Sequence, residues 1–116
     1  MLSLLLLINS VRASTSQITE DKWLTKAAEI RCHTMSVWSH LGFPIPAQRL
    51  LGYYYMGENL ATGYNPQYGP RPTFNAWQNS PAHKANDEDT HYSKIGYAYC
   101  NNSIGTTSVL LFGGND

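Results

Sequence analysis

IGYAYCNNSIGTTSVLLF, residues 95–112, is the stretch that decides the fold of this chain. Its apolar, aromatic and β-branched residues predict two strands, 95–100 and 106–112, joined as a hairpin across residues 101–105. The segments before it favour helices, and strands do not alternate with helices along the chain. Helices first and strands later predict an α+β domain with an antiparallel sheet.

The clearest helix is predicted over residues 22–40. Apolar side chains recur along one face of this segment, including Leu24, Cys32 and Trp38. Asp21 is a suitable N-cap residue, and the glycine and proline that follow the segment stop the helix.

The middle of the chain predicts shorter elements. YYYMGENLATG, residues 53–63, is expected to be an extended approach to a turn, and residues 63–72 a proline- and glycine-rich loop. Residues 73–79 are expected to be helical. A new short helix is expected to begin at Ser80-Pro81, because serine caps a helix well and proline suits its first position. This helix carries His83 in its first turn.

The first thirteen residues, MLSLLLLINSVRA, allow two interpretations. They have an apolar run and a small residue that suits signal-peptidase cleavage after Ala13, but no positive side chain precedes Arg12. Alternatively, residues 2–13 form a helix of the domain with Arg12 facing water. We favour the helix, so that residues 1–116 make a single domain.

Composition excludes some classes of function. Eight lysines and arginines balance eight aspartates and glutamates, so no basic face for nucleic acid is expected. No stretch reaches the roughly 20 apolar residues of a membrane-spanning helix. The two cysteines, Cys32 and Cys100, allow one disulfide, and two buried free thiols are the alternative.

Several motifs in register resemble the CAP superfamily, which contains cysteine-rich secretory proteins, antigen 5, pathogenesis-related 1 proteins and microbial SCP-domain proteins. The motifs are GENLATG (57–63), WQNSPAHKAN (77–86), HYSKIGYAYC (91–100) and VLLFGG (109–114). Upstream, LLLINSVRAS (5–14) resembles the first helix of the family and WSHLG (38–42) the end of its second. The resemblance is closest to the microbial branch. It implies an α-β-α sandwich in which a three- or four-stranded antiparallel sheet lies between helical layers.

The resemblance also implies a cleft lined by two histidines and two glutamates. His40 in WSHLG and Glu58 in GENL match the first histidine and the first glutamate. Ser80 stands where the second glutamate is usual, so that this set is incomplete. His91 matches the second histidine of the animal and plant branch, and His83 matches one that is typical of the microbial branch.

These residues suit a divalent metal such as zinc, because imidazole and carboxylate are its common ligands. The metal set predicted is His40, Glu58, His83 and His91, with His83 ranked above His91. His83 fills the place of the missing glutamate if the helix from residue 73 runs on past Ser80. Alternatively, Glu58 and its neighbour only build a loop. Structural roles are assigned to Cys32, Cys100, Asn59, Trp77 and Ser80.

Three functions remain open at this point. The first is a secreted binding protein whose His/Glu cleft holds a metal and which binds lipid, sterol or a cell-wall or host component. The second is a metal-assisted hydrolase with Glu58 as general base. The third is a structural or interaction domain with a vestigial cleft. The missing second acid at position 80 and the lack of a nucleophile elbow or HExxH motif favour binding over catalysis.

Overall fold

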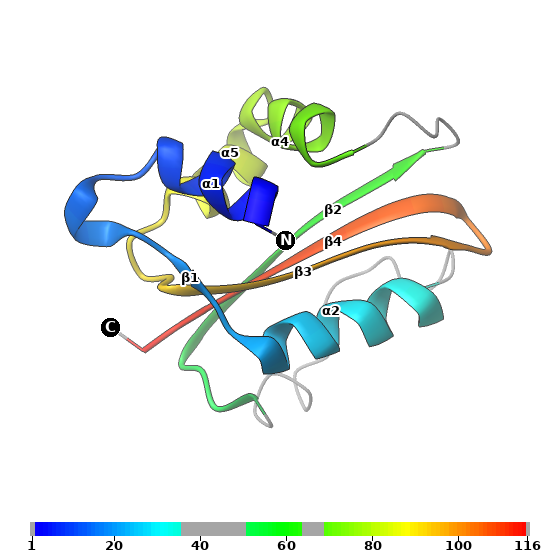
Figure 1. Ribbon diagram of the computed structural model, residues 1–116, viewed down its shortest axis with the longest axis horizontal. Coiled ribbons are helices and arrows are strands. Elements are labelled where there is room, and N and C mark those ends of the chain that lie inside the picture. Colours follow the sequence, from blue (N-terminus) through cyan, green and yellow to red (C-terminus); the bar gives the residue numbers. More distant parts are fainter. Residues whose placement is uncertain (1, 36–50, 64–68, 116) are drawn as a thin grey trace.

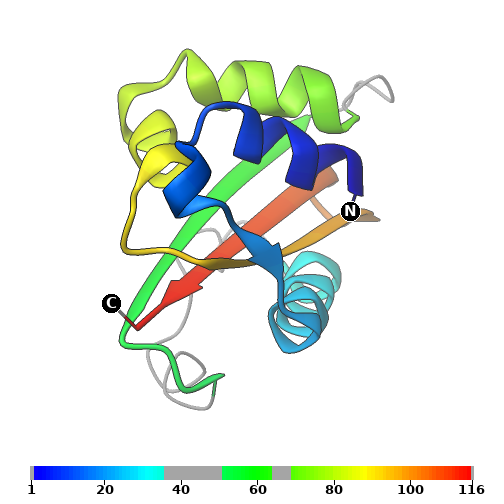
Figure 2. The ribbon, with the colours of Figure 1, turned by 60° about the vertical axis from the view of Figure 1, so that its left-hand side comes forward.

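The computed structural model describes residues 2–35, 51–63 and 69–115. A four-stranded sheet lies between two helical layers (Figure 1). One face is covered by α2, and the other by α1, α4 and α5, as the turned view also shows (Figure 2). The described elements are α1 (Leu2–Ser10), η1 (Ser14–Ser16), β1 (Thr19–Glu20), α2 (Lys22–Thr34), β2 (Tyr55–Gly63), α4 (Pro70–Gln78), α5 (Pro81–Glu88), β3 (Lys94–Asn102) and β4 (Gly105–Gly114).

The α+β prediction is confirmed, but the sheet is mixed. Its strand order is β1-β3-β4-β2, in which β4 is antiparallel to both β3 and β2. The short β1 pairs with β3 in parallel, placing Thr19 opposite Lys94. A purely antiparallel sheet was predicted, and that prediction missed the parallel strand at one edge. Two residues carry too little pattern to reveal a strand, and only their position beside β3 makes them one.

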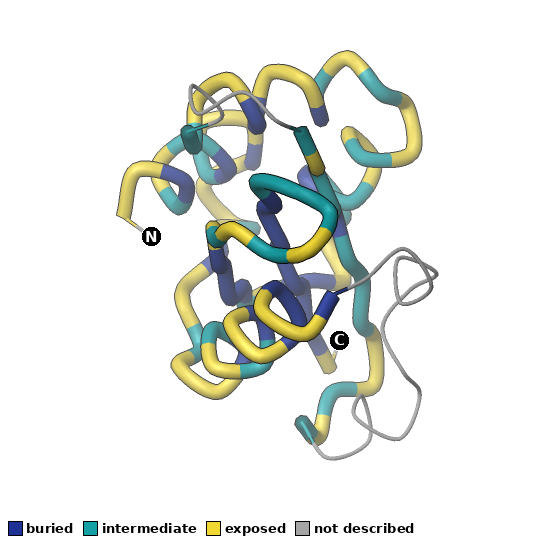
Figure 3. Tube along the Cα trace, turned by 90° about the vertical axis from the view of Figure 1, so that its right-hand side faces the viewer, coloured by how far each residue is buried: buried dark blue, intermediate teal, exposed yellow. Residues whose placement is uncertain are grey.

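The predicted hairpin is present: it consists of β3 and β4, which are the two inner strands of the sheet. Its register runs from Lys94 opposite Gly113 to Asn102 opposite Gly105. Side chains of β4 alternate between two cores: Leu110 packs in the core with residues of α1 and α4, and Leu111 packs in the core with residues of α2. Helices on both faces explain why β4 is a continuous apolar run and is buried over residues 107–114. Dark blue, buried stretches run through the middle of the molecule in Figure 3.

The second strand, β2, is a full nine-residue strand along β4, whereas the sequence predicted an extended approach to a turn. Its pattern is weak because it lies at the edge of the sheet and contains Gly57, Glu58 and Asn59. Likewise, α4 begins at Pro70, three residues before the expected start, because proline is well accommodated in the first helical turn.

Helix α2 packs its predicted apolar face on the sheet. The Asp21 carboxylate accepts a hydrogen bond from the Trp23 amide, which confirms the N-cap. The helix ends at Thr34 and Met35 is extended, so the predicted helix was too long; its last residues, 36–40, lie outside the described part of the chain. A side chain at Gly96 would meet the α2 backbone at 2.1 Å, which explains the need for glycine there.

A disulfide joins Cys32 of α2 to Cys100 of β3, with their Cα atoms 6.2 Å apart. The bridge spans a sequence separation of 68 residues, and a closed loop of that length contributes about 4 kcal/mol to stability in the chain-entropy model. The bridge ties the helix on one face to the inner hairpin, and the alternative of two free thiols is wrong.

Helix α1 packs Leu4 and Ile8 into the core with Phe74 and Trp77. It ends at Ser10, earlier than the expected residue 13. No helix within the described residues has the length and apolar character needed to cross a membrane.

Candidate functional site

Asn59 of the GENL motif fastens helix α5 to strand β2. Its fully buried amide donates 3.0 Å hydrogen bonds to the carbonyl of His83 and to the carboxylate of Asp87. Its oxygen accepts a bond of 2.9 Å from the Asn86 amide. Each polar atom of the side chain thus has a partner, as burial requires. Asn59 lies in a strand, not in the loop of the alternative interpretation, and its contacts join two elements.

Trp77 links helix α4 to strand β2 in a similar way. Its indole nitrogen donates to the carbonyl of Leu60 at 3.1 Å, and its ring is buried in the core beneath α1. The Asn59 and Trp77 contacts therefore both serve to hold helices against the edge strand.

Asp87 is a fully buried carboxylate that the sequence analysis did not single out. It accepts hydrogen bonds from Asn59 at 3.0 Å and from Gln78 at 2.8 Å. Burial raises the pKa of Asp87 to about 6, and the bonds from Gln78 and Asn59 oppose that rise. The acidic stretch after His83 gave the only signal, and it did not distinguish Asp87 from its exposed neighbours.

Glu58 points to the opposite face of the sheet from Asn59, because neighbouring side chains alternate along a strand. Its carboxylate meets Arg31 of α2, with Arg31 Nε 2.7 Å from Oε2 and Nη2 3.1 Å from Oε1. Both side chains are nearly buried, with 7% of Arg31 and 10% of Glu58 exposed. The candidate general base is therefore held in an ion pair.

His83 lies on α5, in the other helical layer. Its Nδ1 is 2.9 Å from the hydroxyl of Ser80. Ser80 occupies the N-cap position as predicted, although its side chain makes no capping bond to the backbone. Helix α4 ends at Gln78 and Ser80 is extended, so the two helices are not continuous and the condition used to rank His83 is wrong.

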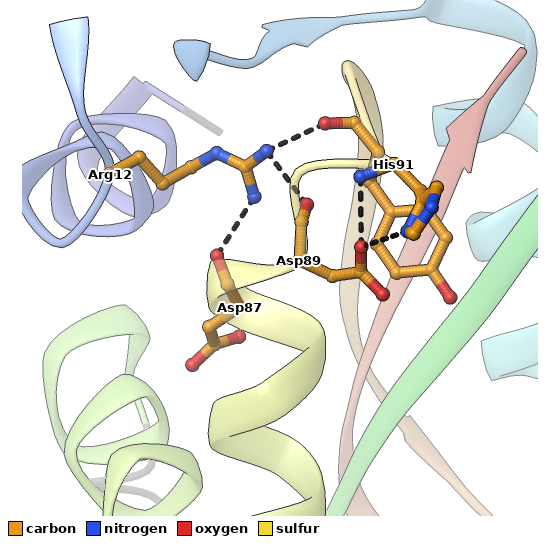
Figure 4. A network of polar contacts seen from close by, with 5 residues as sticks. Arg12, Asp87, Asp89 and His91 are labelled. Carbon is orange, nitrogen blue, oxygen red and sulfur yellow. Dashed lines mark hydrogen bonds and ion pairs between the residues drawn. The ribbon is translucent and has the colours of Figure 1, made fainter. Parts of the chain in front are cut away.

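His91 lies in the turn before β3 and is exposed. Its Nδ1 is 2.7 Å from the carboxylate of Asp89, and its ring packs against Tyr55 with the centroids 4.5 Å apart. Figure 4 shows the His91 ring beside Asp89, at the end of α5.

The described members of the predicted metal set do not meet. Glu58 faces α2, whereas His83 belongs to α5 on the other side of the sheet. His40 lies outside the described residues. Within residues 2–35, 51–63 and 69–115 no three His, Cys, Asp or Glu side chains are grouped to hold a metal ion. Both Glu58 oxygens already contact a guanidinium, so this carboxylate does not fit a metal as it stands. Zinc binding stays a prediction.

Arg12 is buried, with 8% exposed, whereas the sequence placed it in water. Its guanidinium donates to the carbonyls of Asp87 at 3.0 Å, Asp89 at 2.9 Å and Tyr92 at 2.6 Å (Figure 4). A fourth bond, from Nε, reaches the carbonyl of Ser16 at 2.6 Å. A cation at the C-terminal end of α5 also interacts favourably with the helix dipole.

Asn9, three residues earlier, makes two hydrogen bonds to the backbone of Ile18. Its side-chain oxygen accepts from the Ile18 amide at 2.7 Å, and its side-chain nitrogen donates to the Ile18 carbonyl at 3.0 Å. Together with Arg12 it fixes the loop after α1. In the sequence, both stand out as polar residues in or just after the apolar segment of the first helix.

A groove of about 440 Å³ lies between α1 and α4, lined by Ser3, Leu6, Leu7, Ser10 and Arg71. Leu6, which lines the groove, is 63% exposed, so α1 presents an apolar side chain to it. Two leucines beside a cation and two hydroxyl groups give the groove an amphipathic lining. No pattern in the sequence indicated this groove.

Comparison with known proteins finds a likeness to a solved structure. No family model matches the chain, and no curated protein matches it. The solved structure of an outer surface protein from Borrelia burgdorferi is similar, with a TM-score of 0.70 and 27% sequence identity. The match covers 100% of this chain and 92% of that one. The chain is thus similar, along its whole length, to a bacterial outer surface protein.

Proposed function

We propose that this chain is an extracellular or surface-exposed binding protein of the CAP type, and that it binds a single-chain lipid with an anionic head group. The observation that carries the proposal is the groove between α1 and α4, with its leucines and Arg71.

Three observations support the location and the family. The Cys32–Cys100 bridge is typical of oxidising compartments outside the cytosol. The similar solved structure is an outer surface protein. Helical layers on both faces of the sheet agree with the α-β-α sandwich that the sequence motifs imply.

Helix α1 provides the apolar contact for the alkyl chain of the ligand. Leu4 and Ile8 of this helix are committed to the core, whereas Leu2 and Leu6 remain largely exposed. Covering Leu6, which lines the groove, with an alkyl chain removes apolar surface from water, which contributes about 25 cal/mol per Å². The groove volume of about 440 Å³ lies within the usual range for small-molecule sites.

Arg71 provides the positive charge for the anionic head group. This side chain lies in the first turn of α4 and lines the groove. Across the three described segments, no carboxylate is within ion-pair distance of it. A guanidinium offers paired donors that match a carboxylate or phosphate. Ser3 offers a further hydroxyl donor, whereas the Ser10 hydroxyl donates to the carbonyl of Leu7.

The test is calorimetric titration of the delipidated full chain with dodecanoate. Arg71→Gln should weaken binding about fivefold, or about 1 kcal/mol, which suits a partly exposed ion pair. Leu6→Asn should weaken it about tenfold through loss of apolar contact. Methyl dodecanoate should bind the wild type and Arg71→Gln equally, because it has no charge for Arg71 to meet.

Matched controls come from α2 in the other helical layer. Ile30 is 56% exposed and Lys26 is exposed, so Ile30→Asn and Lys26→Gln repeat both changes away from the groove. Each should leave the affinity within twofold of wild type. If the wild type does not bind dodecanoate, or if the α2 variants weaken it as much as the groove variants do, the proposal is wrong.

A further inference from the structure

We propose that Arg31 is the permanent counter-ion of Glu58, and that Glu58 is consequently not a ligand for a divalent metal in this protein. The inference departs from what the sequence motifs imply for this carboxylate, and it is independent of the groove between α1 and α4.

The contact engages both oxygens of the Glu58 carboxylate. Two nitrogens of one guanidinium approach the two oxygens of Glu58, at 2.7 Å and 3.1 Å. Paired bonds between a guanidinium and a carboxylate are shorter, stronger and more directional than neutral hydrogen bonds. With only 7% and 10% of the two side chains exposed, water and salt weaken the pair little.

The backbone of Glu58 is fixed, so its side chain cannot turn to the other face of the sheet. Glu58 lies opposite Leu111 in the β2–β4 ladder. Its carbonyl accepts a hydrogen bond from Asn86 at 3.3 Å. Moving the carboxylate towards α5, where His83 lies, would require a one-residue slip of β2, which would also turn Asn59 out of its buried contacts.

Recruitment of Glu58 by a metal would therefore require displacing Arg31. That displacement would take a carboxylate away from a guanidinium in the interior, which is strongly unfavourable. It would also loosen α2 from the edge strand, because the two charged groups come from these two elements. The charge of Arg31 further repels a cation that approaches the same oxygens.

The first experiment observes the guanidinium directly in the wild-type chain. In ¹⁵N-labelled protein the Arg31 Nε–H signal, assigned by its absence in Arg31→Lys, should stay unchanged when zinc ion is added in tenfold excess. A zinc-dependent shift or loss of this signal that follows the binding isotherm would mean that the metal takes Glu58, and it would overturn the proposal.

The second experiment is a double-mutant cycle on unfolding, measured with a chelator present, using Arg31→Met, Glu58→Gln and the double variant. We expect the two changes to be coupled by at least tenfold in the unfolding equilibrium constant. The exposed Lys84–Glu88 pair, whose charged groups are 3.5 Å apart, is the matched control and should couple by less than twofold. Coupling of Arg31 and Glu58 below threefold would refute a permanent pair.

Discussion

Replacing Arg12 by methionine is expected to destabilise the fold by about 3–4 kcal/mol. The guanidinium makes four hydrogen bonds, to the carbonyls of Ser16, Asp87, Asp89 and Tyr92. Bonds from a charged donor are worth roughly 1.5 kcal/mol each. Part of that gain is offset, because burial of the charge lowers the pKa of Arg12 and thus itself costs free energy. Methionine keeps the apolar part of the side chain and removes both the hydrogen bonds and the cost of burying the charge.

The assay is urea unfolding at pH 7, with thermal unfolding alongside. For a chain of 116 residues a loss of 3–4 kcal/mol corresponds to a fall in melting temperature of about 12–16 °C. Arg12→Lys should restore less than half of the loss, because an ammonium cannot spread its donors over the same carbonyls. Arg71→Met, at an exposed arginine, is the control and should change stability by less than about 0.5 kcal/mol. A cost below 1 kcal/mol for Arg12→Met, or full rescue by lysine, would refute the reasoning.

Three further predictions concern the core and its cross-links. Because the pKa of Asp87 is about 6 in the folded chain and 3.8 as the ordinary value, the folded state holds this proton more tightly. The resulting contribution to the free energy of unfolding is full below about pH 4 and is lost as the pH rises through 6. In urea titrations the wild type should therefore lose up to about 3 kcal/mol relative to Asp87→Asn between pH 4 and 7.5. Parallel pH profiles of the two proteins would contradict this. Thiol titration of the denatured, unreduced protein should find no free Cys32 or Cys100, and reduction should lower stability by about 4 kcal/mol, whereas two titratable thiols would count against the bridge. Leu4→Ala should cost about 3 kcal/mol and Leu6→Ala less than about 0.5 kcal/mol by thermal unfolding, because only Leu4 is buried; equal costs would be inconsistent with the packing of α1.

The sequence predicted the elements whose local signals agree with their environment. The apolar face and Asp21 cap of α2, the serine and proline at the start of α5 and the terminal hairpin are all present. In each, periodicity and end signals point the same way, so that local preference is enough.

Elements at the edge of the sheet were missed for a physical reason. Strand β2 is half-exposed and carries a glycine and polar residues, and β1 has only two residues, so that neither has a clear period of two. Their hydrogen bonds come from β4 and β3, which are distant in the sequence. Pairing with those partners makes them strands, and no local pattern records it.

By itself the sequence determined that this is a small α+β domain with one possible disulfide, and it pointed to Glu58, Asn59, Trp77 and His83 as residues of interest. Only the tertiary structure decided what those residues contact. Strand alternation sends Asn59 to α5 and Glu58 to Arg31 on the opposite face, and the break at Ser80 turns His83 towards Ser80. Arg12 looks like a surface charge on a helix, but the chain folds back so that four carbonyls surround it. Most of these partners lie 27 to 80 residues apart in the sequence. Local spacing does not encode which distant segments meet.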